Sequence, residues 1–173
     1  MRPMGSKTKK APKIAVVVSR YNEGVTDALL YGAVEAYTAF GGRLSNLHVF
    51  EAPGAFELSV LCSEAALTGR YAGVVALGCV IKGDTRHDEY INHAVAQGIT
   101  QASIETGVPI AFGLVTTENA AQATARAGGK SGNKGEEAML ALIDTLAAMR
   151  AIRDGKPEKI ARAVKDKTSK VKR

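Results

Sequence analysis

Two kinds of apolar segment alternate along this chain. Short segments such as 14–18 are almost continuously apolar and rich in valine and isoleucine, a pattern typical of strands buried on both faces of a parallel sheet. Longer segments repeat apolar residues every three or four positions, which predicts amphipathic helices. The helix predicted over 24–40 has this spacing and is followed by Gly41 and Gly42, which favour a helix end.

The alternation continues to about residue 150. Strands are predicted over 14–18, 44–50, 73–80 and 109–115, and helices over 24–40, 55–68, 87–106, 118–126 and 136–150 or slightly beyond. Strands that alternate with helices need crossover connections, which are right-handed and produce a parallel sheet covered on both sides. The pattern therefore predicts one α/β domain over residues 13–150, a three-layer α/β/α sandwich around a four-stranded parallel sheet.

Composition agrees with a single domain outside the membrane. The chain has 173 residues, of which 46% are hydrophobic and 23% charged, enough for one compact core. Its longest apolar segments fall far short of the roughly 20 residues that cross a bilayer. The first 13 residues contain no apolar stretch of a secretory signal, so we expect a cytoplasmic protein. Cys62 and Cys79 are too few for a disulfide framework, and we expect both to be reduced and buried.

The net charge of +6 belongs to the two ends of the chain. Residues 1–13 contain five basic and no acidic residues, and residues 151–173 contain nine basic and three acidic ones. Residues 14–150, by contrast, carry nine basic against fourteen acidic residues. We interpret 1–12 and 151–173 as basic tails, the second partly helical or disordered. No aromatic residue lies between their charges to stack on bases, which argues against nucleic-acid binding.

Ligands of parallel α/β sheets bind beyond the carboxyl ends of the strands, and here the loops at those ends are polar. The loop after the first predicted strand lacks the G-x-G-x-x-G of dinucleotide sites, and neither Lys82 nor Lys134 follows the glycine that a phosphate-binding P-loop requires. His87 and His93 are six residues apart, which places them on different sides of a helix, so no metal site is predicted.

His87 is the candidate for proton transfer. It begins a predicted helix two residues after Thr85, and the backbone N–H groups around Asp84 and Thr85 can bind an anion. An imidazole exchanges protons near neutral pH, but a structural histidine at a helix start fits the same residues. A nucleophilic pair of Cys79 and His87 is a third interpretation, weakened by the buried run around Cys79.

Other loop residues also have two interpretations. Tyr21 either closes the edge of the core or stacks on a flat ring. The segment 53–57 is either a plain turn into a helix, with Glu57 near the positive end of the helix dipole, or a ligand loop. Arg126 either pairs with the carboxyl end of a helix or binds a phosphate. Spacing alone does not choose between them.

Together, five segments resemble the 6,7-dimethyl-8-ribityllumazine synthase family of riboflavin biosynthesis. They are SRYN at 19–22, PGAFE at 53–57, GCVIKGDTRH at 78–87, FGLVTT at 112–117 and RAGGKSGNKG at 126–135. The resemblance covers about residues 13–150 and implies a flavodoxin-like fold. It also implies the condensation of 5-amino-6-(D-ribitylamino)uracil with 3,4-dihydroxy-2-butanone 4-phosphate, with neither a cofactor nor a metal.

The resemblance assigns roles to individual residues. His87 matches the proton-transfer residue, and Glu137 matches an acidic residue that can orient it, with Lys134 close by. The phosphate-binding positions are matched by Asp84, Thr85 and Arg126. The positions that bind the pyrimidine ring and the ribityl chain are matched by Tyr21, Ala55, Phe56, Glu57, Cys79, Val80, Ile81 and Phe112. Tyr21 stands where many members have Phe or Trp, and Arg86 adds a positive charge beside the histidine.

The resemblance further implies a homo-oligomer. Such enzymes form pentamers with the active site between neighbouring subunits, and some pack twelve pentamers into an icosahedral shell, which the short loop at 128–135 favours. Two alternatives remain open: a member that binds flavin or lumazine without catalysis, and a shell protein whose basic tails recruit RNA or acidic partners. Retention of His87 and Arg126 argues against the first, because ring binding alone needs neither a proton shuttle nor a phosphate anchor.

Overall fold

The computed structural model describes residues 12–156, so most of both predicted basic tails lies outside the described residues. The strands of the main sheet are β1 (Ile14–Ser19), β2 (Leu47–Ala52), β3 (Gly73–Ile81) and β4 (Ile110–Thr117). The helices are α1 (Glu23–Ala39), α2 (Leu58–Leu67), α3 (His87–Thr106), α4 (Ala120–Arg126) and α5 (Lys134–Arg153). A 3₁₀ turn (Leu44–Asn46) and the short strands β5 (Ala127–Gly129) and β6 (Gly132–Asn133) complete the chain.

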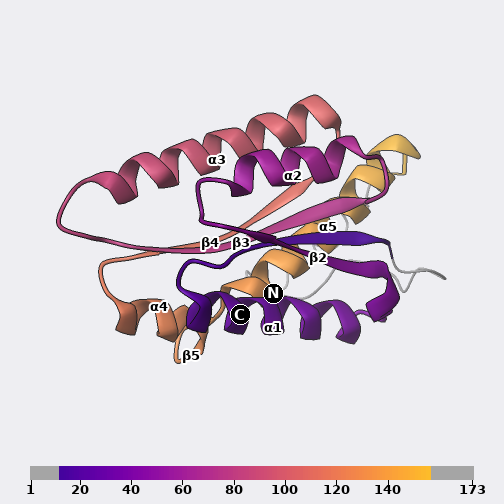
Figure 1. Ribbon diagram of the computed structural model, residues 1–173. Helices are drawn as coiled ribbons and strands as arrows, with labels where there is room; N and C mark the ends of the chain where they lie inside the picture. The colour runs from indigo at the N-terminus through magenta and orange to yellow at the C-terminus, as the bar shows by residue number, and fades with distance from the viewer. Residues whose placement is uncertain (1–11, 157–173) are drawn as a thin grey trace, which may run out of the picture.

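The four strands form one parallel sheet in the order β2-β1-β3-β4. Helices α2 and α3 cover one face of this sheet, and α1, α4 and α5 cover the other (Figure 1). The predicted three-layer α/β/α sandwich with a flavodoxin-like, four-stranded parallel sheet is therefore confirmed. Across residues 12–156, none of the helices combines the length and the apolar character that a membrane span requires.

The core is divided by the sheet into two apolar clusters. Val16 and Leu77 pack with Leu29 of α1 and Met139 of α5 on one face of the sheet. The strand residues that alternate with these, such as Val17, point to the other face and pack with α2 and α3. Every residue of β1 is buried. Burial on both faces explains why this segment is continuously apolar rather than alternating.

Several predicted boundaries were wrong, and local hydrogen bonds explain most of them. The second strand begins at Leu47 because 44–46 forms a 3₁₀ turn. The second helix begins at Leu58, since the Leu58 N–H first closes a turn onto the Ala55 carbonyl at 3.1 Å. Helix α4 begins two residues later than predicted because the Asn119 side chain accepts a hydrogen bond from the Gln122 N–H and caps it.

The last helix differs from its prediction at both ends. It begins at Lys134 rather than 136, because the Asn133 side chain caps it. It continues to Arg153, so the segment given as the carboxyl-terminal tail begins inside a helix. The loop predicted at 128–135 contains the antiparallel pair β5–β6. This hairpin brings the chain from α4 back to α5.

Candidate active site

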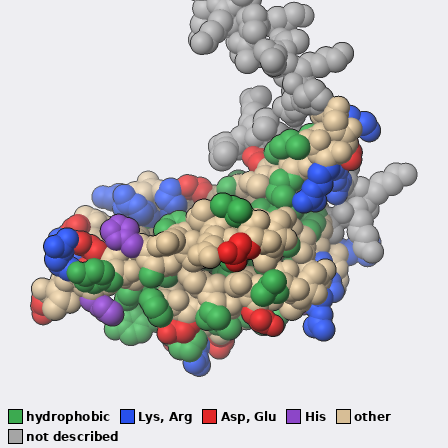
Figure 2. All heavy atoms as spheres, turned by 90° about the horizontal axis from the view of Figure 1, so that it is seen from above, with side chains coloured by type: hydrophobic (Ala, Val, Ile, Leu, Met, Phe, Trp, Pro, Cys, Tyr) green, Lys and Arg blue, Asp and Glu red, His purple; other side chains and the backbone are tan. Residues whose placement is uncertain are grey.

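The carboxyl ends of the strands meet at one edge of the molecule, on the left of Figure 1. Charged and histidine side chains gather at this end when the molecule is viewed onto the face covered by α2 and α3 (Figure 2). Segments 19–22 and 53–57 begin where β1 and β2 end, and segments 78–87 and 112–117 run along β3 and β4 to this edge.

The turn after β1 presents Tyr21 to solvent. Its side chain is 70% exposed, and its backbone N–H donates to the buried Ser19 Oγ at 3.2 Å. Asn22 follows in the left-handed conformation with φ 64°, and its Nδ2 donates to the Cys79 carbonyl oxygen at 3.0 Å. This bond joins the Tyr21 turn to the end of β3. An exposed ring on a fixed turn is available for stacking.

The loop after β2 lies against the same part of β3. A Cβ placed on Gly78 would lie 3.8 Å from the Ala55 Cβ and 3.0 Å from Leu58 Cδ1, so the loop packs where β3 has no side chain. Ala55 is buried, and Phe56 is 60% exposed. A Cβ on Gly54 would lie 3.0 Å from Glu57 Oε2. The Glu57 carboxylate thus folds back over the loop, where it can accept hydrogen bonds from hydroxyl groups.

The end of β3 is buried as far as Val80, and Ile81 is half-buried. Both cysteines are free and buried, which confirms the expectation for them. Burial raises the pKa of Cys79 to about 11, so its thiol is protonated at neutral pH. A protonated thiol is a poor nucleophile, which argues against a catalytic pair of Cys79 and His87.

The segment from Lys82 to His87 is exposed and connects β3 to α3. His87 is the first residue of α3, and its backbone N–H lies 3.4 Å from Thr85 Oγ1. Its position at the start of the helix, two residues after Thr85, matches the prediction. Arg86 is turned to Glu89, whose Oε2 accepts from Arg86 Nη2 at 2.7 Å. Arg86 therefore has a carboxylate partner on α3.

A cation–carboxylate pair links this segment to the end of β4. Lys82 Nζ lies 3.1 Å from Glu118 Oε2, and the hydrogen bond to Glu118, together with its charge, raises the pKa of Lys82. The Lys82 backbone N–H donates to the Thr117 carbonyl at 2.8 Å. These two contacts hold the beginning of the 82–87 segment on the β4 side of the edge.

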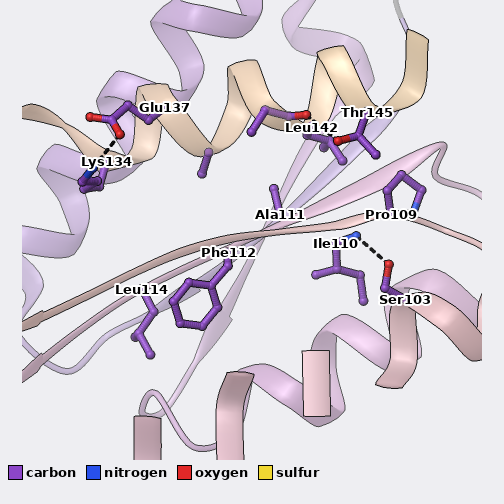
Figure 3. Close-up of a pocket in the computed structure, with 12 residues that line it drawn as sticks. Ser103, Pro109, Ile110, Ala111, Phe112, Leu114, Lys134, Glu137, Leu142 and Thr145 are labelled. Atoms are coloured by element: carbon purple, nitrogen blue, oxygen red, sulfur yellow. Dashed lines mark hydrogen bonds and ion pairs between the residues drawn. The ribbon is translucent and has the colours of Figure 1, made fainter. Parts of the chain in front are cut away.

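Phe112, Lys134 and Glu137 line a different part of the molecule. They border a cavity of about 540 Å³ between α3, β4 and α5. Figure 3 shows Phe112 on the α3 side of the strand, with Lys134 and Glu137 on α5 across from it. Phe112 pairs with Ala76 in the sheet, well before β3 reaches the carboxyl edge, and its side chain is 48% exposed.

Lys134 and Glu137 pair with each other. Their Nζ and Oε2 atoms are 2.5 Å apart, one turn apart on α5. Tyr21 and His87 are not among the residues around this cavity. The predicted role of Glu137 in orienting His87 stays a prediction, because the interaction that the structure shows for Glu137 is with Lys134.

Arg126 is the last residue of α4, and its side chain is partly exposed. The hairpin that follows is anchored by Asn133, whose Nδ2 donates to the Ala28 carbonyl of α1 at 2.8 Å. Its Oδ1 accepts from the Gly135 and Glu136 N–H groups. Asn133 therefore fixes the connection between Arg126 and Lys134.

The structure thus brings together one part of the predicted site and leaves another part separate. At the carboxyl edge, the end of β3 contacts the turn with Tyr21 through Asn22 and Cys79, and it contacts the 55–57 loop through Gly78 and Ala55. Phe112 and the Lys134–Glu137 pair lie on the outer side of β4. Asn22 and Asn133 lie in matched segments, but the sequence analysis gave neither of them a role, although asparagine tolerates left-handed backbone and often caps helices. No cluster of three or more His, Cys, Asp or Glu side chains arranged to hold a metal occurs within residues 12–156.

Comparison with known proteins places this chain in a family. Residues 11–150 match the family model described as 6,7-dimethyl-8-ribityllumazine synthase. The chain belongs to the 6,7-dimethyl-8-ribityllumazine synthase family. The synthase of Chlorobium phaeovibrioides is 47% identical over 140 residues, which cover 81% of this chain and 90% of that protein.

Two further lumazine synthases have the same degree of similarity. That of Deinococcus radiodurans is 46% identical over 140 residues, covering 81% of this chain and 90% of its own. A protein of Caulobacter vibrioides named 6,7-dimethyl-8-ribityllumazine synthase 1 is 45% identical over 143 residues, covering 83% and 94%. The lumazine synthase match ends at residue 150, three residues before the end of α5.

Proposed function

We propose that this chain is an active lumazine synthase whose reaction takes place at the carboxyl edge of the sheet. It condenses 5-amino-6-(D-ribitylamino)uracil with 3,4-dihydroxy-2-butanone 4-phosphate to give 6,7-dimethyl-8-ribityllumazine, phosphate and water in riboflavin biosynthesis. The observation that carries the proposal is the contact between three matched segments, 19–22, 53–57 and 78–81, at one end of the fold. A stacking ring, a carboxylate and a strand backbone are thereby presented together.

The pyrimidine substrate is proposed to bind against β3. Tyr21 stacks on the ring, and Phe56 borders it. The backbone of Cys79, Val80 and Ile81 supplies the hydrogen bonds that a uracil edge requires, as donor and acceptor groups alternate along a strand. Glu57 accepts hydrogen bonds from the ribityl hydroxyl groups, and Ala55 lies beneath the chain. No cofactor is needed, because the chemistry is addition and elimination.

The phosphorylated ketone is proposed to bind beside the start of α3. Asp84 and Thr85, in the exposed segment that precedes the start of α3, offer backbone N–H groups to the phosphate, which also lies near the positive end of the helix dipole. Arg126 provides a bidentate phosphate ligand. The substrate amine adds to the ketone and water leaves to give an imine. Phosphate is then eliminated, the resulting enol becomes a ketone, and the second amine adds to that carbonyl with loss of a second water, which closes the ring. His87 moves the protons of these steps.

The site is proposed to be completed by a neighbouring copy of the chain. Phe112 and the Lys134–Glu137 pair border a cavity on the outer side of edge strand β4, away from Tyr21. Large apolar side chains are also exposed on α2 and α3, among them Val60 and Ile104, which is 77% exposed. Exposed apolar surface of this kind is typical of subunit contacts. We propose a pentamer, with a sixty-subunit shell as its larger form, in which β4 of one copy faces the Tyr21 edge of the next.

The activity is tested by mixing the protein with both substrates and following lumazine formation by absorbance and fluorescence, against the uncatalysed condensation. Acceleration is expected, and a His87→Ala variant should be markedly slower in kcat. His93→Ala is the matched control, since His93 is exposed six residues further along α3. A His87→Ala enzyme with full turnover would refute the proton-transfer role. No acceleration by the unchanged chain, with riboflavin still bound, would indicate a binding protein.

Sedimentation or light scattering tests the proposed pentamer. A monomer at the protein concentration used in the activity assay would contradict this proposal. The basic tails at 1–12 and 151–173 and the cytoplasmic location stay predictions of the sequence.

A further inference from the structure

The turn after β1 is held to the end of β3 by the side chain of Asn22. The pairing of β1 with β3 extends as far as Val18 and Leu77. Two residues further along β3, the Cys79 carbonyl accepts a hydrogen bond from Asn22 Nδ2 at 3.0 Å. The side chain therefore occupies the place that a longer β1 would take.

The direction of the β3 backbone shows what lies next to this bond. The N–H and C=O of one strand residue point to the same side, and this side alternates along the strand. The Lys82 N–H donates a hydrogen bond to the Thr117 carbonyl of β4. The backbone N–H and C=O groups of even-numbered residues at this end of β3 therefore point toward β4. Cys79 faces the opposite side, toward Asn22, and the backbone groups of Ile81 share that direction. The Tyr21 turn and the Ile81 backbone thus border the same space.

The backbone of Asn22 is also specialised. Among the described residues it is the non-glycine residue with positive φ, 64°, a conformation that is unfavourable for most residues and that asparagine tolerates better. Its carbonyl accepts from the Val25 and Thr26 N–H groups at 2.9 and 3.1 Å, which starts α1. One residue therefore joins the Tyr21 turn to a helix start and to β3.

We propose that Asn22 is a positioning residue for the pyrimidine substrate. Its bond to Cys79 sets the distance between the Tyr21 ring and the Ile81 backbone, the two surfaces between which a flat, uracil-like ring is held. Asn22 acts through these two residues and not by contact with the ring. This inference rests on the proposed function of the edge as the pyrimidine site.

Asn22→Gly and Asn22→Asp test it in the intact protein. Glycine adopts positive φ freely but lacks the donor, and aspartate keeps the shape but presents an acceptor to the Cys79 carbonyl. Loss of one net hydrogen bond corresponds to about a 3- to 10-fold change in an equilibrium constant. We expect KM for the pyrimidine to rise by this factor in Asn22→Gly, and at least as far in Asn22→Asp, while KM for the ketone phosphate changes less than about twofold.

Two comparisons make the result decisive. Asn46→Gly, in the turn at the opposite end of the sheet, should leave both KM values unchanged. Tyr21→Ala should raise KM for the pyrimidine if the ring binds at this edge. If Tyr21→Ala raises it and Asn22→Gly does not, or if Asn22→Gly lowers only the urea midpoint, the positioning role is overturned and the function stands. If Tyr21→Ala has no effect, the proposed pyrimidine site itself is wrong.

Discussion

Replacing Gly32 with alanine should destabilise this protein, and the same replacement should stabilise it once the Asn133 side chain has been removed. Gly32 lies inside α1, where alanine is ordinarily more stable than glycine by about 0.5–1 kcal/mol. A Cβ at this position would overlap the Cγ, Nδ2 and Oδ1 atoms of Asn133. Alanine can therefore be accommodated only if the Asn133 side chain moves away.

The size of the effect follows from what Asn133 does. Its Oδ1 caps α5 by accepting from the Gly135 N–H at 2.8 Å and the Glu136 N–H at 3.2 Å, and removal of a cap costs about 1 kcal/mol. Its Nδ2 bond to the Ala28 carbonyl, 2.8 Å long, contributes about 1 kcal/mol more. Asn133→Ala should thus cost about 2 kcal/mol. Gly32→Ala should cost about 1 kcal/mol. It displaces the Asn133 side chain and so loses the same interactions, but the higher helix propensity of alanine offsets part of that loss.

The assay is urea unfolding of the unchanged protein, both single variants and the double variant, all at one protein concentration because assembly couples to stability. In the Asn133→Ala background, Gly32→Ala should stabilise by about 0.5–1 kcal/mol, a coupling of about 2 kcal/mol. Gly24→Ala is the control: it lies in the first turn of α1 with nothing within 4 Å of an added Cβ, so it should not reverse sign. Additive single effects within about 0.5 kcal/mol would refute the reasoning.

Three further outcomes are expected. Gly135→Ala should destabilise by more than about 2 kcal/mol in urea unfolding, because its Cβ would overlap the Leu29 carbonyl of α1; a smaller change would mean that the helices separate easily. Burial raises the pKa of the Cys62 thiol to about 12, so between pH 9 and 11 the unfolded chain loses a proton that the folded chain keeps, and stability should fall as pH rises. Cys62→Ala should lessen that fall, measured by unfolding at pH 8 and 10, and an equal fall in both proteins would contradict this. Arg126→Ala should chiefly raise KM for the ketone phosphate in steady-state kinetics, with Arg43→Ala as control, and equal KM values for Arg126→Ala and the unchanged enzyme would exclude a phosphate contact.

Much of the fold could be predicted because burial leaves a direct record in the sequence. The segment 14–18 is apolar at every position since both faces of β1 are covered, and the helix at 87–106 was predicted with the bounds that the structure has. The predicted boundaries of helices and strands were wrong where a single side chain or a short turn determines the residue at which the element begins. The cap at Asn119 and the turn at 44–46 are local hydrogen-bond choices that apolar spacing does not reveal.

The candidate site could be predicted in part for a different reason. The topology of a parallel sheet sends every strand end to one edge, so polar loops far apart in the chain are expected to meet there. The sequence does not reveal the bonds that fix those loops. Asn22 reaches Cys79, 57 residues away, and Asn133 reaches Ala28, 105 residues away. Such pairs depend on the final packing, so no local pattern predicts them.

These two asparagines explain how exposed residues can be held in place at this edge. Tyr21 is largely exposed and Arg126 is half-buried, and neither is fixed by core packing. Tyr21 lies in the turn after β1, and Arg126 ends α4 directly before the β5–β6 hairpin; an asparagine amide ties each of these two connections to another element of the fold. A neutral amide suits this task because it donates to a backbone carbonyl without placing a charge beside the binding site. The core thus determines where the strands end, and the asparagines determine how the residues beyond those ends are presented to substrate.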